Sequence, residues 1–149
     1  MITLEQIQEA QSRVNRMIEE FYKQQKPIEY VVPESRIELL PGERYAGIVL
    51  DDNGKPSHHL IMLPGDSERA SWADQMAWAD CIGGELPTRR EQSLLFANLC
   101  GFEAAAYWSA ETYAEDSSCA WCQTFDDGYQ YFSHESAELR AVAVRRVFV

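Results

Sequence analysis

Four cysteines and three histidines are the side chains of this sequence best suited to metal or redox chemistry. Cys119 and Cys122 form a C-x-x-C pair, but Cys81 and Cys100 stand apart and provide no second pair to complete a zinc site. The pair falls in a segment with strand character, where positions three apart point to opposite faces. It also does not open a helix after a βαβ unit, as a thioredoxin-like motif does. We therefore expect free, mostly buried thiols, with a metal site or a disulfide as the alternatives.

The histidines are spaced poorly for a metal centre. His58 and His59 are adjacent, so on a strand they point to opposite faces, and His134 stands alone in a turn. The sequence also contains no G-x-S-x-G, no P-loop and no Gly-rich dinucleotide turn. We expect no catalytic residues, no metal and no cofactor, and interpret the protein as a non-enzyme.

Aromatic side chains gather in the carboxy-terminal region and form our candidate binding site. They are interleaved with amides and one imidazole, and the candidate residues are Tyr113, Trp121, Gln123, Tyr129, Tyr131, Phe132 and His134. Tyrosine and tryptophan give a large contact area at a small cost in conformational entropy, which suits a binding surface. Since only one face of each strand can be exposed, the alternative is that half of these rings fill the core. If Trp121 and Phe125 point inward and Gln123 points outward, the outer set is polar with a few tyrosines.

The acidic balance of the chain limits its partners and its location. The formal net charge is −11 at pH 7, and such a surface repels phosphate, so we expect no direct nucleic-acid binding. No apolar run approaches the roughly 18 residues of a membrane span. The first residues lack the basic region and apolar stretch of a secretory signal. We therefore expect a cytoplasmic protein without a membrane span.

Residues 3–25 have the pattern of one long amphipathic helix. Thr3 and Gln6 make a capping box, and Pro27 ends the segment. Apolar residues recur every three or four positions, as at the a and d positions of a coiled coil, with one polar position at Gln11. These apolar residues are Leu4, Ile7, Val14, Ile18 and Phe21. We expect the helix to associate copies of the chain, and the alternative is that it lies on its own domain.

The remaining sequence divides into a connector and one domain. Residues 1–26 hold the helix, residues 27–40 are a Pro-punctuated connector, and residues 41–149 make the domain, which suits a chain of 149 residues. Strands are expected at both ends of the domain, with two short helices between them. This order predicts an α+β domain with an antiparallel sheet.

Local signals place the first hairpin and the two short helices. Asn53-Gly54 between two β-prone runs predicts a two-residue turn, which would set Asp52 opposite Lys55. Ser71 caps the first helix, and Thr88 caps the second with Glu91 three residues on. The expected buried face of the first helix comprises Trp72, Met76 and Ala79.

Four short motifs follow one another along the domain. They are the segments 83–91 (GGELPTRRE), 107–109 (YWS), 125–128 (FDDG) and 144–147 (VRRV). Over residues 41–149 this order resembles the Lcl-type C-terminal domain, a family of unknown function related to formylglycine-generating-enzyme and C-type-lectin-like folds. The whole chain is similar to small hypothetical proteins of tailed phages and prophages. The resemblance implies a C-type-lectin-like domain with an antiparallel sheet and two short helices.

The resemblance also suggests a function. In C-type-lectin-like folds the aromatic carboxy-terminal region presents the ligand surface, and the same is implied here. We expect a non-enzymatic phage or prophage binding module that recognises a host protein or glycan, in the host cytoplasm or in a virion. Copies would be joined through residues 3–25, which multiplies weak affinities. An enzyme of the formylglycine-generating type would instead require bound copper or iron.

The second hypothesis comes from another class, an acidic inhibitor of a host defence complex. Its carboxylates would imitate the phosphates that a nucleic-acid-binding enzyme expects. Four acids would favour mimicry if they clustered on one face. They are Asp126, Asp127, Glu135 and Glu138. Three arginines of the motifs, Arg89, Arg145 and Arg146, are expected to pair with Glu91 or other acids.

Overall fold

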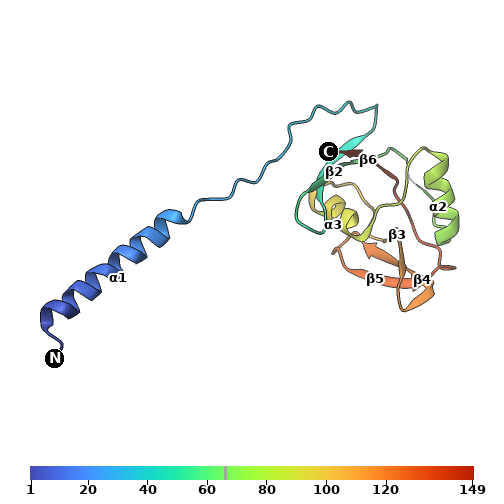
Figure 1. The fold of residues 1–149 in the computed structure, drawn as a ribbon. Coiled ribbons are helices and arrows are strands. Elements are labelled where there is room, and N and C mark those ends of the chain that lie inside the picture. The colour runs from blue at the N-terminus through green and yellow to red at the C-terminus, as the bar shows by residue number, and fades with distance from the viewer. Residues whose placement is uncertain (66) are drawn as a thin grey trace. The chain divides into compact units, whose positions relative to one another are not determined.

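The structure is a computed structural model that describes residues 1–65 and 67–149 (Figure 1). The chain divides into two compact units, Met1–Val32 and Pro33–Val149. The elements in chain order are α1 (Leu4–Gln24), β1 (Arg44–Leu50), β2 (Pro56–Met62), α2 (Trp72–Cys81), α3 (Arg89–Asn98), β3 (Ala106–Tyr113), β4 (Asp116–Thr124), β5 (Gln130–His134) and β6 (Val144–Phe148). Within the described ranges, none of the helices combines the length and apolar character needed to cross a bilayer.

Helix α1, with 21 residues, makes up about two thirds of the first unit and confirms the helix expected over residues 3–25. The Thr3 hydroxyl accepts the Gln6 N–H at 3.3 Å, and the Gln6 side chain accepts the Thr3 N–H at 3.0 Å. Both bonds satisfy amide groups that have no partner within the first turn. No residue of α1 is buried, so its apolar stripe is exposed.

The second unit contains two small antiparallel sheets. The first has the strand order β1-β2-β6 and the second β3-β4-β5. The expected α+β class with antiparallel strands is confirmed, but the strands form two sheets rather than one. Strand β6 closes the first sheet because it pairs with β2, far away in sequence, and not with the preceding strand β5.

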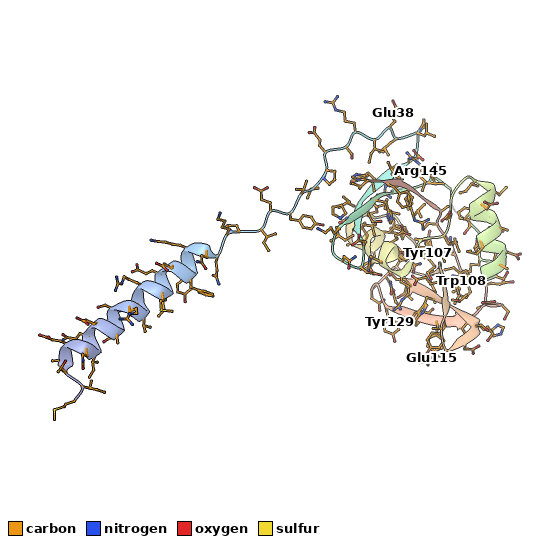
Figure 2. The ribbon with its side chains drawn as sticks, viewed as in Figure 1. Glu38, Tyr107, Trp108, Glu115, Tyr129 and Arg145 are labelled. Carbon is orange, nitrogen blue, oxygen red and sulfur yellow. The ribbon has the colours of Figure 1, made fainter. Side chains whose placement is uncertain are left out.

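Helix α3 packs against both sheets, contacting β1 of the first and β3 and β4 of the second, whereas α2 contacts β3. Two apolar clusters result. One contains Tyr107, and the other surrounds Trp108. These adjacent residues of β3 point to opposite faces of the strand, and Figure 2 shows both inside the domain. Trp108 anchors the second cluster, because its large side chain has no exposed surface.

The turn between β1 and β2 differs from the prediction. The Gly54 N–H donates to the Asp51 carbonyl at 3.0 Å, and the Asp51 N–H donates to the Lys55 carbonyl at 2.7 Å. Gly54 has a φ of 75°, but the asparagine before it does not have a positive φ, which a two-residue Asn-Gly turn requires. Asp52 therefore does not lie opposite Lys55, and its carboxylate lies 3.0 Å from the guanidinium of Arg90.

The two short helices begin as predicted, with Ser71 and Thr88 at their N-caps. The buried face of α2 is wrong at Met76, which is exposed. Gln75 occupies the buried position instead. Its side-chain amide donates to two backbone carbonyls at 2.7 and 2.9 Å, and these bonds offset the cost of burying a polar group.

Candidate functional site

The two faces of the β3-β4-β5 sheet share the predicted site residues between them. Strand pairing sets Trp121 beside Phe132, and alternation along β4 and β5 gives one face to Tyr113, Trp121, Gln123, Phe132 and His134. Tyr129 and Tyr131 belong to the opposite face, where Tyr131 packs on the cluster around Trp108. The structure thus brings five predicted residues onto one face and leaves two on the other.

Tyr113, Trp121 and Phe132 form a surface group that we call the aromatic cluster. The Tyr113 and Phe132 rings stack with centroids 3.9 Å apart and 6° between their planes. Trp121 meets these two rings edge-on, at centroid distances of 5.4 and 5.9 Å. Phe132 is 45% exposed, and the other two side chains are half-buried. The cluster therefore presents aromatic surface to solvent in a fixed arrangement.

Arg89 holds the tryptophan of this cluster from the side of α3. Its guanidinium carbon lies 3.5 Å from the centroid of the Trp121 ring, a cation–π contact. The Arg89 Nε also donates to the Gln130 Oε1 at 3.0 Å. Because Arg89 is the first residue of α3, the helix start positions the cation. The sequence predicts an acid beside Arg89, whereas the structure places the tryptophan ring against its guanidinium.

Gln123 supports the sheet from inside. It is fully buried, its Nε2 donates to the Gln92 carbonyl at 3.2 Å, and its Oε1 accepts from Gln130 at 2.7 Å. The outward orientation considered for Gln123 is therefore not found. The amide cannot face water because α3 covers this end of the strand.

The other three predicted residues differ in exposure. Tyr129 is 66% exposed and lies at the edge of the domain in Figure 2, where its ring stacks on Tyr131 at 5.9 Å. Tyr131 is half-buried. His134 is exposed, and its Nδ1 lies 2.7 Å from the Ser136 hydroxyl. Neither tyrosine joins the aromatic cluster.

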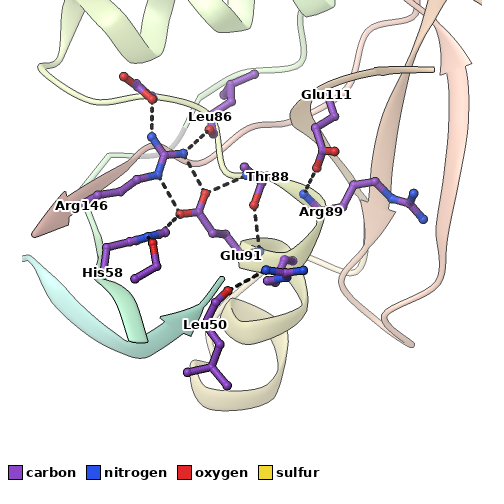
Figure 3. A network of polar contacts seen from close by, with 11 residues as sticks. Leu50, His58, Leu86, Thr88, Arg89, Glu91, Glu111 and Arg146 are labelled. Carbon is purple, nitrogen blue, oxygen red and sulfur yellow. Dashed lines mark hydrogen bonds and ion pairs between the residues drawn. The ribbon is translucent and has the colours of Figure 1, made fainter. Parts of the chain in front are cut away.

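A second polar arrangement lies at the start of α3, where the Glu91 carboxylate joins two sheet strands (Figure 3). Arg146 of β6 donates from Nε to Glu91 Oε2 at 2.8 Å and from Nη2 to Glu91 Oε1 at 2.7 Å. The same guanidinium also contacts Glu85. His58 Nε2 of β2 lies 2.7 Å from Glu91 Oε2, and the Thr88 N–H donates to Glu91 Oε1 at 2.9 Å.

These contacts keep Glu91 ionised although it is fully buried. Burial by itself raises the pKa of the carboxyl, but the hydrogen bonds from Arg146, the Thr88 N–H and His58 outweigh it and lower the pKa to about 2. The pKa of Arg146 is raised by its hydrogen bond to Glu91, against the effect of burial. The pairing expected between Arg146 and Glu91 is thus confirmed. Arg145 also pairs with an acid, its Nε lying 2.7 Å from Glu43.

The neighbouring serine extends the network to a Ser57–His58–Glu91 chain. The Ser57 hydroxyl lies 2.9 Å from His58 Nδ1. Both residues line a pocket of about 500 Å³ between the β1–β2 turn and the start of α3. The guanidinium of Arg146 already balances the charge of Glu91 through two hydrogen bonds, and His58 adds a third side-chain contact to the same carboxylate. The arrangement therefore serves to tie α3 to both β2 and β6.

The two cysteines of strand β4 are poorly placed to act as nucleophiles or metal ligands. Cys119 and Cys122 are buried in β4 as free thiols, whereas Cys81 and Cys100 are exposed, so the expected burial holds only for the C-x-x-C pair. Burial raises the pKa of the Cys122 thiol and so lowers its thiolate fraction. Among the described residues, no group of three or more His, Cys, Asp or Glu side chains is arranged to hold a metal ion.

Comparison of the chain with models of known protein families and with curated proteins finds no match.

Proposed function

We propose that residues 41–149 form a C-type-lectin-like domain of the Lcl type, and that the domain is a non-enzymatic phage or prophage module that binds a host protein or glycan. The roles of the motif residues support this fold. Gly83-Gly84 ends α2 closely against β6, and the following residues cap α3. Trp108 fills the core, and Arg145 and Arg146 tie β6 to acids.

The observation that carries the proposed function is the aromatic cluster. Tyrosine, tryptophan and arginine are the residues most enriched at the energetic centres of interfaces. Here ring stacking and the Arg89 cation–π contact fix the ring orientations before a ligand arrives. A preformed surface loses less side-chain freedom on binding, so more of the contact energy remains as affinity.

The charges around the cluster select a neutral or basic partner. The Tyr113 hydroxyl donates to Glu115 at 3.0 Å, and Asp116 begins the next strand. The only cation in direct contact with the cluster, within the part of the chain that the structure describes, is Arg89, whose face is already covered by Trp121. A phosphate-bearing ligand would be repelled, whereas the aromatic faces suit apolar side chains or the C–H faces of sugars.

A matched pair of phenylalanine substitutions tests the surface. Phe132→Ala opens the aromatic cluster, and Phe148→Ala removes an exposed phenylalanine from β6 of the other sheet. The full chain is applied to an array of bacterial surface glycans and to purified host envelope proteins. Phe132→Ala should weaken the strongest interaction at least tenfold, about 1.4 kcal/mol, whereas Phe148→Ala should leave it unchanged. Equal binding by both variants would refute the site.

The four acids named for mimicry do not support the inhibitor hypothesis. Asp126 and Asp127 precede β5, whereas Glu135 and Glu138 follow it. A five-residue strand separates the two pairs by roughly 15 Å. The acids are therefore spread along the hairpin, which favours a solvated surface over a phosphate-like cluster.

A further inference from the structure

Helix α1 displays an apolar face without any packing partner in its own unit. Six large apolar side chains are between 48% and 69% exposed, namely Leu4, Ile7, Val14, Met17, Ile18 and Phe21. Helices in proteins gain most of their stability from packing such a face. A stripe of this size in a 21-residue helix therefore requires an occupant.

The distribution of charge on α1 identifies that occupant. With Leu4 as position a of a heptad, all seven charged residues fall at positions b, c and f, on the outer side; they are Glu5, Glu9, Arg13, Arg16, Glu19, Glu20 and Lys23. Positions a and d form the line of contact between helices, which we call the seam, and positions e and g flank it. Positions e and g hold only uncharged residues: Gln8, Ala10, Asn15, Met17, Tyr22 and Gln24. A helix that paired with a charged foreign partner would be expected to carry complementary charges at e and g.

The outer charges match one another within the helix. Glu9 precedes Arg13 by four residues, and Glu19 precedes Lys23 by four, the favourable order for intrahelical pairs. Arg16 and Glu20 are also four apart, in the reverse and less favourable order. The charges therefore support the single helix and place no like-charge repulsion between identical seams.

We propose that α1 assembles three or four copies of this chain into a parallel, in-register coiled coil. Leucine at a with isoleucine at d favours more than two strands, and Leu4 and Ile7 have this arrangement. Val14, also β-branched, occupies the next d position. The uncharged g residues Ala10 and Met17 widen the apolar face, as packing against two neighbours requires.

Gln11 sets the orientation. It occupies the central a position, so in a parallel assembly the Gln11 amides of all copies meet in one layer and hydrogen-bond to one another. In an antiparallel assembly an a layer faces a d layer, and the amide would be buried against Val14 without a partner, at a cost of about 1–3 kcal/mol by mutational measures. This inference concerns residues 3–25 alone and does not depend on what the domain binds.

Two aspartate substitutions in the full chain test the seam. Val14→Asp places a charge at a d position, whereas Ser12→Asp places the same charge at a b position on the outer side. Sedimentation equilibrium should give the wild type and Ser12→Asp three or four times the mass of the 17.0 kDa chain, and Val14→Asp that of one chain. A monomeric or dimeric wild type, or an unchanged mass for Val14→Asp, would overturn the proposal.

Tryptophan fluorescence of the same three proteins reports separately on the domain. All four tryptophans lie outside α1, at residues 72, 78, 108 and 121, so their fluorescence follows only the domain. It should be identical in the three proteins. An altered spectrum in Val14→Asp, together with loss of the assembly, would show that the substitution acts through the domain and would contradict a seam confined to α1.

A cysteine substitution tests the orientation. Leu4→Cys, in a background with the exposed Cys81 and Cys100 changed to serine, should form a disulfide between copies on mild oxidation, because a parallel assembly brings the same a positions together. The matched control is Glu5→Cys at the outward b position in the same background. Crosslinking of Leu4→Cys at least tenfold faster than the control supports the parallel arrangement. Equal rates would show that position 4 of one copy does not meet its counterpart.

Discussion

Glu91 accepts hydrogen bonds from a guanidinium, an imidazole side chain and a backbone amide at one buried carboxylate, and this makes it the residue on which the start of α3 depends. Glu91→Gln leaves the partly buried Arg146 without its main counter-charge, which should lower the free energy of unfolding by about 3–5 kcal/mol. Glu85 contacts the same guanidinium, but its side chain is 71% exposed. Glu85→Gln should therefore cost less than about 1 kcal/mol. Urea unfolding followed by tryptophan fluorescence measures both, and equal losses would contradict the central role of Glu91.

The same carboxylate makes stability depend on acid pH. Its pKa falls from 4.5 to about 2 on folding, so its contribution is complete above about pH 4.5 and is lost as the pH falls toward 2. The shift corresponds to about 3 kcal/mol. We expect the difference in unfolding free energy between the wild type and Glu91→Gln to shrink by that amount between pH 6 and pH 2. Urea titrations at several pH values measure it, and parallel profiles would show that Glu91 has an ordinary pKa in the folded chain.

Residue roles were predictable where the partner lies within one helical turn. The capping boxes at Thr3 and Thr88 follow from neighbours three positions away, and both are present. The contact between Glu91 and His58, and the ring of Trp121 under Arg89, join separate elements. The residue types can be read from the sequence, but local patterns do not predict which strand packs beside α3. The burial of Gln123 depends on the same packing and could not be read from alternation alone.

At the scale of elements, the link between α2 and α3 positions the start of α3 and the hydrogen bonds around Glu91. Gly84 lets this link pass close to β6. A Cβ at Gly84 would lie 2.6 Å from Leu63 Cδ1 and 2.9 Å from the Val144 carbonyl oxygen. Gly84→Ala should therefore cost about 1–3 kcal/mol through overpacking. Gly83→Ala is the matched control, because its Cβ meets nothing within 4 Å and only its φ of 86° is unfavourable, at about 1–2 kcal/mol. Thermal unfolding measures each variant against the wild type, and an unchanged stability for Gly84→Ala would contradict the close packing.

Element types were predictable more readily than their pairing. Periodicity and caps identify α1, α2 and α3, and Asp51–Lys55 is the turn expected between two strands. The three-residue turn is held locally, because the Asp51 carboxylate accepts the Asn53 and Lys55 N–H groups at 2.9 and 3.0 Å. The Asn-Gly pair alone does not distinguish this turn from a two-residue one. The division into two sheets depends instead on β6 reaching β2 across most of the domain sequence, a contact between segments that lie far apart in the chain.

At the scale of the whole molecule, the proposals for α1 and for the aromatic cluster assign assembly and recognition to different units of the chain. Helix α1 holds four acids and three bases, so −10 of the net charge of −11 lies outside it. Repulsion between acidic domains falls off within about 8 Å at physiological ionic strength, and a connector lets the domains keep apart while the helices meet. Joining copies in the proposed way would raise the effective concentration of the aromatic clusters at a surface with repeated ligands.

The two units should therefore unfold in separate transitions that respond differently to protein concentration. Helix α1 contributes 21 helical residues against 10 each in α2 and α3, so about half of the far-ultraviolet ellipticity reports on it. By mass action, a hundredfold increase in concentration should raise the midpoint of this helical transition by at least about 5 °C. The tryptophan transition, which follows the domain, should not move. If both midpoints stay constant, α1 does not associate, and if both rise together, the copies also contact one another through their domains.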